Sequence, residues 1–330
     1  MKKMLILALV LTILGVTITA SAQSSYLWEN LCPSGQFETE QQGSGLIIRC
    51  LNPVQPTPTA PPAPTATPIP PTPPASGAII IDHDDVTRFN QIPEAYINSA
   101  KNLSVYIKNA SVGSNLSFGL DCLAGNANSL VNGRRKWACD VDTPLAERVV
   151  NSRYDRSRWS FNFFSSSGWD GKTNEFLSTV NAMPAHQYNY VGYKFCYLEI
   201  MSGSSIDDLY FSRNPNDAFP GINNIEALES RQNLIFWTSA LARSAGTTEA
   251  TSYNRQMREY AAANGKVLFD LADILSHHPN GSSCVNTNGE ANICDEYTNE
   301  SQGGHLNSYG ALKVAQAYWV LMARLAGWQY

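Results

Sequence analysis

Leu103-Ser104-Val105-Tyr106-Ile107 runs directly into Lys108-Asn109-Ala110-Ser111-Val112-Gly113-Ser114-Asn115. The first five residues are rich in β-branched and apolar side chains and predict a strand. The residues after them are small and polar, with a glycine two residues after Ser111, so we expect a sharp turn there. A serine at such a strand end is well placed as a nucleophile, because the amides of the turn can face an oxyanion. The alternative is an ordinary strand-to-helix turn that Ser111 caps.

Residues 78–330 alternate between strand-like and helix-like segments. The further strand-like runs are 159–164, 190–198, 233–238 and 266–270, and the helix-like segments are 173–180, 222–231 and 253–263. A last helix has apolar residues at helical spacing from Leu312 to Leu325, with Asn307 or Ser308 as its cap and Gly327 after its end. Five strands alternating with helices favour a parallel, doubly wound sheet, in which ligands bind at the C-terminal ends of the strands.

The composition of the 330-residue chain excludes several classes of protein. Hydrophobic residues make up 43% and aromatic residues 10%, which is enough for a sizeable core and excludes wholesale disorder. Charged residues make up only 15%, and the formal net charge is −5. Because no run of lysine and arginine occurs, we expect neither a nucleic acid nor an anionic membrane as a partner.

The first 22 residues have the pattern of an export signal. Lys2 and Lys3 precede an apolar run over residues 5–18, and Thr19-Ala20-Ser21-Ala22 supplies a cleavage site of small residues. We therefore expect residues 1–22 to be a signal peptide of the bacterial type. The protein is then expected to be secreted or associated with the cell surface, without a membrane span after cleavage.

Two segments separate this signal from the α/β domain. Residues 23–52 predict a small module, in which Gly43-Ser44-Gly45 and the apolar run after it indicate a hairpin stapled by Cys32–Cys50. Residues 53–77 form a Pro/Thr-rich linker, since 11 of the 18 prolines lie between Pro53 and Pro74. Such a tract is extended and has no packed core.

The seven cysteines are interpreted in the light of export. In an oxidising compartment six of them form three local pairs: Cys32–Cys50, Cys122–Cys139 and Cys284–Cys294. Cys196 is left over, within residues 193–200, which indicate a buried strand. It is either a structural thiol behind the site, a side chain that lines a pocket, or a redox centre.

His305 is the second candidate catalytic residue. It stands in Gly303-Gly304-His305-Leu306-Asn307, a glycine-rich loop directly before the last helix. A histidine in a polar loop of this kind is well placed to reach a serine at a strand end.

These motifs together resemble the SGNH/GDSL hydrolase family. The resemblance covers roughly residues 78–330 and rests on Ser111-Val-Gly-Ser, on Tyr253-Asn254 before the strand that ends in Phe269-Asp270, and on His305-Leu306-Asn307. The segments Ile81-Asp82-His83-Asp84 and Gln91-Ile92-Pro93 and the ending Ala323–Trp328 are similar to an uncharacterised bacterial branch. The resemblance implies a flavodoxin-like three-layer α/β/α sandwich.

The same resemblance implies serine-dependent hydrolysis of small-molecule or glycan esters, acetyl and acyl groups on carbohydrates or lipids among them. Ser111 would be the nucleophile and His305 the general base. The oxyanion donors would be the backbone amides of Ser111 and of Gly168, which stands in Ser167-Gly168-Trp169.

Two departures from the family pattern concern the site. The family places an aspartate three residues before the histidine, where this chain has Gln302; Glu300 or Asp295 could replace it. The third strand lacks the Gly-x-Asn-Asp block of the family, whose asparagine donates to the oxyanion, and Lys194 or Asn115 could compensate. These departures leave open a catalytically impaired protein that uses the fold for binding or surface adhesion.

Two other groups of residues could suggest a metal site. His83 lies among Asp82, Asp84 and Asp85, but acids before a helix are more often caps and dipole partners. His277-His278 precedes Pro279 in what we expect to be an exposed loop without further ligands. Since Cys-x-x-Cys and Cys-x-x-His are also absent from the sequence, we expect neither a metal nor a cofactor.

Overall fold

The computed structural model describes residues 37–42, 45–50, 77–124, 152–194, 196–200, 204, 206, 221–243 and 247–330. The chain divides into two units, Met1–Thr67 and Pro68–Tyr330. In the first unit, β1 (Phe37–Gln42) pairs antiparallel with β2 (Gly45–Cys50), with Gln42 opposite Gly45, which agrees with the expected hairpin. The expected signal peptide lies outside the described residues. So do Cys32, with its expected bond to Cys50, and the expected linker except for its last residue.

The second unit contains a six-stranded parallel sheet. Its strands are β3 (Ile79–Ile81), β4 (Val105–Asn109), β5 (Trp159–Phe163), β6 (Tyr190–Lys194), β7 (Asn233–Trp237) and β8 (Val267–Phe269). The spatial order is β3-β8-β7-β6-β4-β5. Counted from β4, the last five strands follow the flavodoxin order 2-1-3-4-5, so the order reverses between β4 and β6. The predicted fold class is therefore confirmed.

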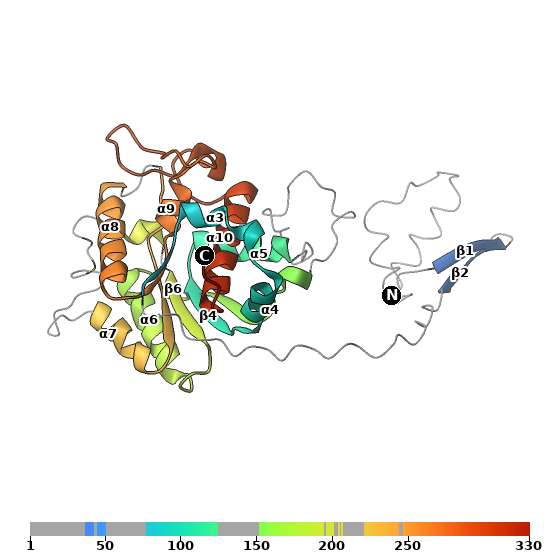
Figure 1. The fold of residues 1–330 in the computed structure, drawn as a ribbon. Helices are drawn as coiled ribbons and strands as arrows, with labels where there is room; N and C mark the ends of the chain where they lie inside the picture. The colour runs from blue at the N-terminus through green and yellow to red at the C-terminus, as the bar shows by residue number, and fades with distance from the viewer. Residues whose placement is uncertain are drawn as a thin grey trace. The chain divides into compact units, whose positions relative to one another are not determined.

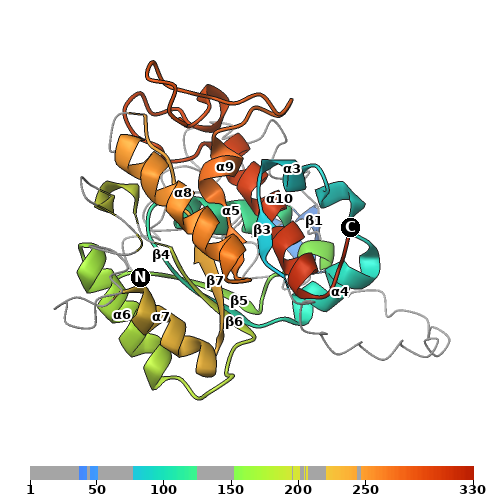
Figure 2. The ribbon, with the colours of Figure 1, turned by 60° about the vertical axis from the view of Figure 1, so that its left-hand side comes forward.

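Helices cover both faces of this sheet, which gives a three-layer α/β/α sandwich (Figures 1 and 2). One layer holds α3 (His83–Val86), α4 (Glu94–Asn102), α5 (Val112–Leu123) and α10 (Ser308–Leu325). The other holds α6 (Trp169–Ala182), α7 (Ile222–Glu226) and α8 (Thr247–Ala263), while α9 (Leu271–Leu275) follows β8. Short 3-10 helices are η1 (Phe89–Gln91), η4 (Ser152–Tyr154), η5 (Tyr197–Glu199), η6 (Ala227–Ser230) and η7 (Asp295–Tyr297).

Helix α10 is the buried centre of its layer. The side chain of Asn307 caps it by accepting a hydrogen bond from the amide of Gly310, and Gly327 follows its end with φ 100°. It packs closely on α5, because a Cβ on Gly119 would lie 2.1 Å from the carbonyl oxygen of Ala311. No helix of the described residues is long and apolar enough to cross a membrane.

Two expectations about the strands need correction. The edge strand β3 was missed, because three residues are too short for a recognisable period. The third predicted strand, 190–198, ends at Lys194 and turns into η5, where the Cys196 amide donates to the Glu199 carboxylate at 2.9 Å. Cys196 therefore lies beyond the strand as a free, partly exposed thiol rather than inside a buried strand.

One of the expected disulfides is seen in full. Cys284 and Cys294 are joined with their Cα atoms 5.4 Å apart. Cys122 is also disulfide-bonded, and its expected partner Cys139 lies outside the described residues.

Candidate active site

Ser111 occupies a strained turn between β4 and α5. Its φ of 55° and ψ of −117° place a non-glycine residue in a region that costs about 1–3 kcal/mol. The turn is tight, since a Cβ on Gly113 would lie 2.6 Å from the Cβ of Asn109. The hydroxyl of Ser111 makes no capping hydrogen bond to α5. The turn therefore exposes the side chain at the C-terminal edge of the sheet, beside the point where the strand order reverses.

The hydroxyl of Ser111 meets the ring of His305. Ser111 Oγ and His305 Nε2 lie 2.8 Å apart, within hydrogen-bond reach, although 194 residues separate them. His305 stands just before α10, and the close contact between α5 and α10 brings the two loops together. The ring of Tyr197 packs edge-on against the imidazole, with the ring centroids 6.0 Å apart.

Glu300 holds the other side of the imidazole. Its Oε1 lies 2.9 Å from His305 Nδ1, and its Oε2 accepts the His305 amide at 3.0 Å. Burial alone would raise the pKa of Glu300, but the hydrogen bonds from the amide and ring of His305 hold it below its usual value. The structure thus aligns a serine hydroxyl, an imidazole and a carboxylate.

Gln302 and Asp295 were the other residues considered for this position. Gln302 is exposed, and His305 Nδ1 already has the Glu300 carboxylate as its partner. Asp295 is 93% exposed and pairs with Arg243 at 2.8 Å. Among the three carboxylate or amide candidates named from the sequence, Glu300 is the one whose carboxylate lies against His305 Nδ1.

Asn115 anchors the loop that carries His305. It is buried on α5, and its Oδ1 accepts the amide hydrogen of Leu306 at 2.9 Å. On the other side of the loop, Thr298 Oγ1 donates to the carbonyl oxygen of His305 at 2.6 Å. The observed contact of Asn115 therefore positions the histidine loop, whereas its expected role at an oxyanion stays a prediction.

Gly168 is the N-terminal cap of α6, on the neighbouring strand-to-helix connection. Its φ of 72° is one that glycine adopts without strain. The loop before it is fixed by Glu175, which accepts hydrogen bonds from the amides of Ser165 and Ser166 and pairs with Lys108 at 2.5 Å. Since β4 and β5 are parallel neighbours, Gly168 and Ser111 follow adjacent strand ends. Donation by the Gly168 amide to an oxyanion stays a prediction.

Lys194 lies directly behind the serine turn. Its ammonium group is almost fully buried and donates to the carbonyl oxygen of Ala110 at 3.0 Å. Burial lowers the pKa of this lysine to about 8. The contact supports the backbone of the strained turn, and it shows Lys194 bonded to the turn itself rather than reaching past it.

A buried ion pair lies beside Lys194, and it was not predicted from the sequence. Lys172 of α6 pairs with Glu199 of η5, and both side chains are buried. Glu199 also accepts the amide of Cys196, so this pair fixes the segment that leads to Tyr197. The two residues are 27 positions apart in the sequence, and no local motif predicts their contact.

Comparison with known proteins adds little to this geometry. No protein-family model matches the chain, and no curated protein matches it. Among solved structures, the chain is similar to a protein described as a possible lipase from Chitinophaga pinensis DSM 2588. The two are 11% identical with a TM-score of 0.34, over 66% of this chain and 96% of that chain. A likeness of this size carries no argument about the site.

Proposed function

We propose that residues 78–330 form a serine ester hydrolase of the SGNH/GDSL type. The observation that carries the proposal is the 2.8 Å contact between Ser111 Oγ and His305 Nε2, extended by the Glu300 carboxylate at 2.9 Å from Nδ1. A nucleophile, a base within hydrogen-bond reach and a third group that orients the base form the arrangement used for acyl transfer.

In this mechanism Ser111 Oγ attacks the ester carbonyl while His305 Nε2 takes its proton. The imidazolium then gives that proton to the leaving alcohol, and the negative charge of Glu300 stabilises the imidazolium. A water molecule, activated by the same imidazole, releases the acid from the acyl-enzyme. The reaction consumes one ester and one water and needs no oxidant or reductant.

The oxyanion would be bound by backbone groups. We propose the amides of Ser111 and Gly168, helped by the N-terminal end of α5, whose dipole favours negative charge at its first turn. Leu198, 64% exposed and next to Tyr197, would give the acyl group an apolar contact. The substrate class that we propose, a small acyl ester of a carbohydrate or a lipid, is the one that the resemblance to the SGNH/GDSL family implies.

The rival function, binding without turnover, had three arguments in its favour. One of them, Gln302 in place of a carboxylate, is weakened by the contact between Glu300 and His305 Nδ1. The missing asparagine donor of the third strand and the N-terminal module joined by a proline-rich linker, which suits a surface-tethered protein, remain. We also propose that the protein is exported, supported by the signal pattern of residues 1–22 and by the Cys284–Cys294 disulfide, since such bonds persist in oxidising compartments.

The test is hydrolysis of p-nitrophenyl acetate by the chain from Gln23 onward, compared with Ser111→Ala and His305→Ala. We expect both variants to lose activity by a factor of about 10³ or more. A fluorophosphonate probe should label the wild type and not Ser111→Ala. Equal hydrolysis in all three proteins would refute the proposal, and probe labelling of Ser111→Ala would assign the reactivity to another residue.

A further inference from the structure

A cluster of two histidines and an aspartate lies at the other end of the sheet order, after β3 and β8. His83 opens α3 directly after β3, Asp273 belongs to α9 after β8, and His277 follows the end of α9. Because β3 and β8 are parallel neighbours, their C-terminal ends deliver these residues to one place. The expectation that His277 lacks further potential ligands is thus wrong, since His83 and Asp273 stand beside it.

The donor atoms of this cluster are spaced as metal ligands are. His83 Nδ1 lies 2.5 Å from Asp273 Oδ2, and His277 Nδ1 lies 3.5 Å from Asp273 Oδ1. The two imidazoles are stacked, with centroids 3.6 Å apart and planes 8° from parallel. Ligands about 2.0–2.2 Å from one zinc ion lie roughly 3–3.5 Å from one another. The donor atoms of all three residues lie within 4.8 Å of one another, and the two stacked rings must turn toward each other for both nitrogens to face one ion.

The present partners of His277 are weak competitors for such an ion. Its Nδ1 lies 2.9 Å from the backbone oxygen of Asp273, and its Nε2 lies 3.1 Å from Ser283 Oγ. Both are neutral hydrogen-bond partners, worth about 1 kcal/mol each. Coordination through Nδ1 would keep the Ser283 contact on Nε2, where it would orient the ring as outer partners of metal-bound histidines do.

Groups of both signs surround the cluster. Asp84 adds a further carboxylate oxygen 3.4 Å from His83 Nε2. On the other side, the ammonium group of Lys313 donates to the backbone carbonyl oxygen of His277 at 2.7 Å, so this cation is bound to the backbone next to the site.

His83, one of the three residues of the cluster, also lines a cavity of about 470 Å³. The wall of this cavity further includes Asp84, and Tyr309 and Lys313 of α10. The side chains of the three ligands are 15–22% exposed, so an ion can enter without unfolding of the chain. A cavity beside a three-ligand site leaves room for water in a fourth position.

We propose that His83, Asp273 and His277 form a binding site for a divalent transition-metal ion of the zinc class. Two imidazoles and one carboxylate suit such an ion better than magnesium or calcium, which prefer oxygen ligands alone. The bound ion joins the end of β3 to the end of α9, so it raises the stability of the folded domain by mass action. This site is separate from Ser111 and His305 and does not rest on the proposed function.

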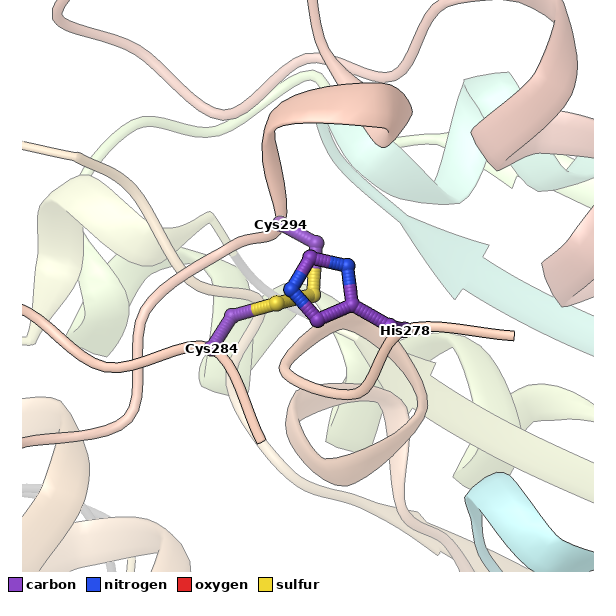
Figure 3. Close-up of side chains that lie close together, drawn as sticks. All are labelled: His278, Cys284 and Cys294. Carbon is purple, nitrogen blue, oxygen red and sulfur yellow. A yellow bond between two sulfur atoms is a disulfide. The ribbon is translucent and has the colours of Figure 1, made fainter. Parts of the chain in front are cut away.

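His278 supplies the matched control. It is adjacent to His277, but its imidazole lies beside Cys284 and Cys294, whose sulfurs are joined in a disulfide and cannot act as thiolate ligands (Figure 3). Its Nδ1 is paired with Glu296 at 2.8 Å. A His278→Gln variant therefore removes a neighbouring imidazole without touching the proposed site.

The experiment measures binding of Zn²⁺ alone to the chain from Gln23 onward, freed of metal with a chelator, by calorimetry. Absorption of bound Co²⁺ in the visible range reports the coordination. We expect one equivalent to bind, about 100-fold more weakly or worse in His83→Gln and in His277→Gln, and unchanged in His278→Gln and in His305→Gln. Zn²⁺ should also raise the Tm of the wild type and of the two controls only.

Three results would overturn the proposal. They are no saturable binding by the wild type, equal loss in His278→Gln, or loss in His305→Gln, which would place the ion at the candidate active site. Should His83→Gln fail to fold, Asp273→Asn serves in its place, because the amide oxygen can still accept the His83 amide hydrogen while the charge is removed. Circular dichroism checks the fold of each variant.

Discussion

The Glu300 carboxylate contacts His305 at two points: one oxygen accepts the backbone amide hydrogen, and the other lies against ring Nδ1. Both contacts depend on Gly303 and Gly304, which lie between the two residues in the sequence. A Cβ on Gly303 would lie 1.9 Å from Glu300 Oε2, and one on Gly304 would lie 2.1 Å from the carbonyl oxygen of Leu241. The path of the loop therefore requires glycine at 304, while a side chain at 303 would displace the Glu300 carboxylate from His305. Together the two glycines let a carboxylate five residues away reach the imidazole.

Replacement of Glu300 by glutamine should impair catalysis far more than it impairs folding. The amide can still accept a hydrogen bond, but it carries no charge to stabilise the imidazolium, so we expect kcat to fall by about 10²–10⁴-fold. Gln302→Ala is the control, because its side chain is exposed and His305 Nδ1 already has Glu300 as its partner, and its rate should stay within about twofold. Hydrolysis of p-nitrophenyl acetate measures both. A larger loss in Gln302→Ala than in Glu300→Gln would contradict the assignment.

Removal of the Asn115 side chain tests its positioning role. Asn115→Ala leaves the buried amide of Leu306 without its acceptor, which should destabilise the domain by about 1–3 kcal/mol. The histidine loop should loosen at the same time, so kcat should fall while the Tm drops. Ser114→Ala, on the same turn of α5, is the control. A fall in kcat at unchanged Tm would instead assign Asn115 to the oxyanion.

The sequence predicted the parts of this site that local pattern determines. Ser111 and His305 were identifiable because each stands in a turn with glycines, next to a strong strand or helix. The partner of His305 was less certain, because whether Glu300, Gln302 or Asp295 reaches the ring depends on how the glycine loop folds back. The fold of this loop depends on the close approach of Gly303 to Glu300 and of Gly304 to Leu241. No rule of sequence spacing predicts these approaches.

Contacts between distant segments were the least predictable. Lys172 with Glu199, and His83 with Asp273 and His277, meet because parallel strands deliver their loops to one edge of the sheet. The strand that brings His83 there, β3, is only three residues long. Because β3 was not predicted, neither the sixth strand of the sheet nor the contact between His83 and His277 could be inferred from the sequence.

Glu175 should make the stability of the domain depend on acidic pH. Burial alone would raise its pKa, but hydrogen bonds from Lys108 and from the amides of Ser166 and Ser165 lower it to about 2. A carboxyl whose folded pKa is lowered stabilises the fold above its unfolded pKa, and the gain is lost as the pH falls through the folded value. The gain is thus complete above about pH 4.5 and disappears toward pH 2.

Urea unfolding of the wild type and Glu175→Gln at several pH values measures this effect. We expect the variant to be less stable by about 1–2 kcal/mol at pH 7, with the difference shrinking below pH 4. Glu259→Gln is the control, because its pair with Arg255 is exposed on both sides and should be worth less than about 0.5 kcal/mol. A difference that stays constant from pH 7 to pH 3 would show that charge is not the cause.

The contact between Gly119 and Ala311 should control the distance between Ser111 and His305. A Cβ at Gly119 would lie 2.1 Å from the Ala311 carbonyl oxygen and 3.0 Å from the Ala315 Cβ, so Gly119→Ala must push α5 away from α10. We expect a loss of about 1–3 kcal/mol in the free energy of unfolding. Because the two helices follow the serine and the histidine loop, kcat should fall by more than the folded fraction explains.

Gly171→Ala is the control that separates the displacement of α5 from α10 from the general effect of replacing a helical glycine by alanine. Gly171 is also helical, but its nearest neighbour would be the Ser166 Cβ at 3.4 Å, so alanine fits there and should leave stability unchanged or slightly improved. Labelling by the fluorophosphonate probe, corrected for the folded fraction, measures how well His305 still activates Ser111. If Gly119→Ala labels at the wild-type rate, the packing of α5 on α10 does not set the geometry of the pair, and the loop contacts of Asn115, Thr298 and Glu300 must hold it.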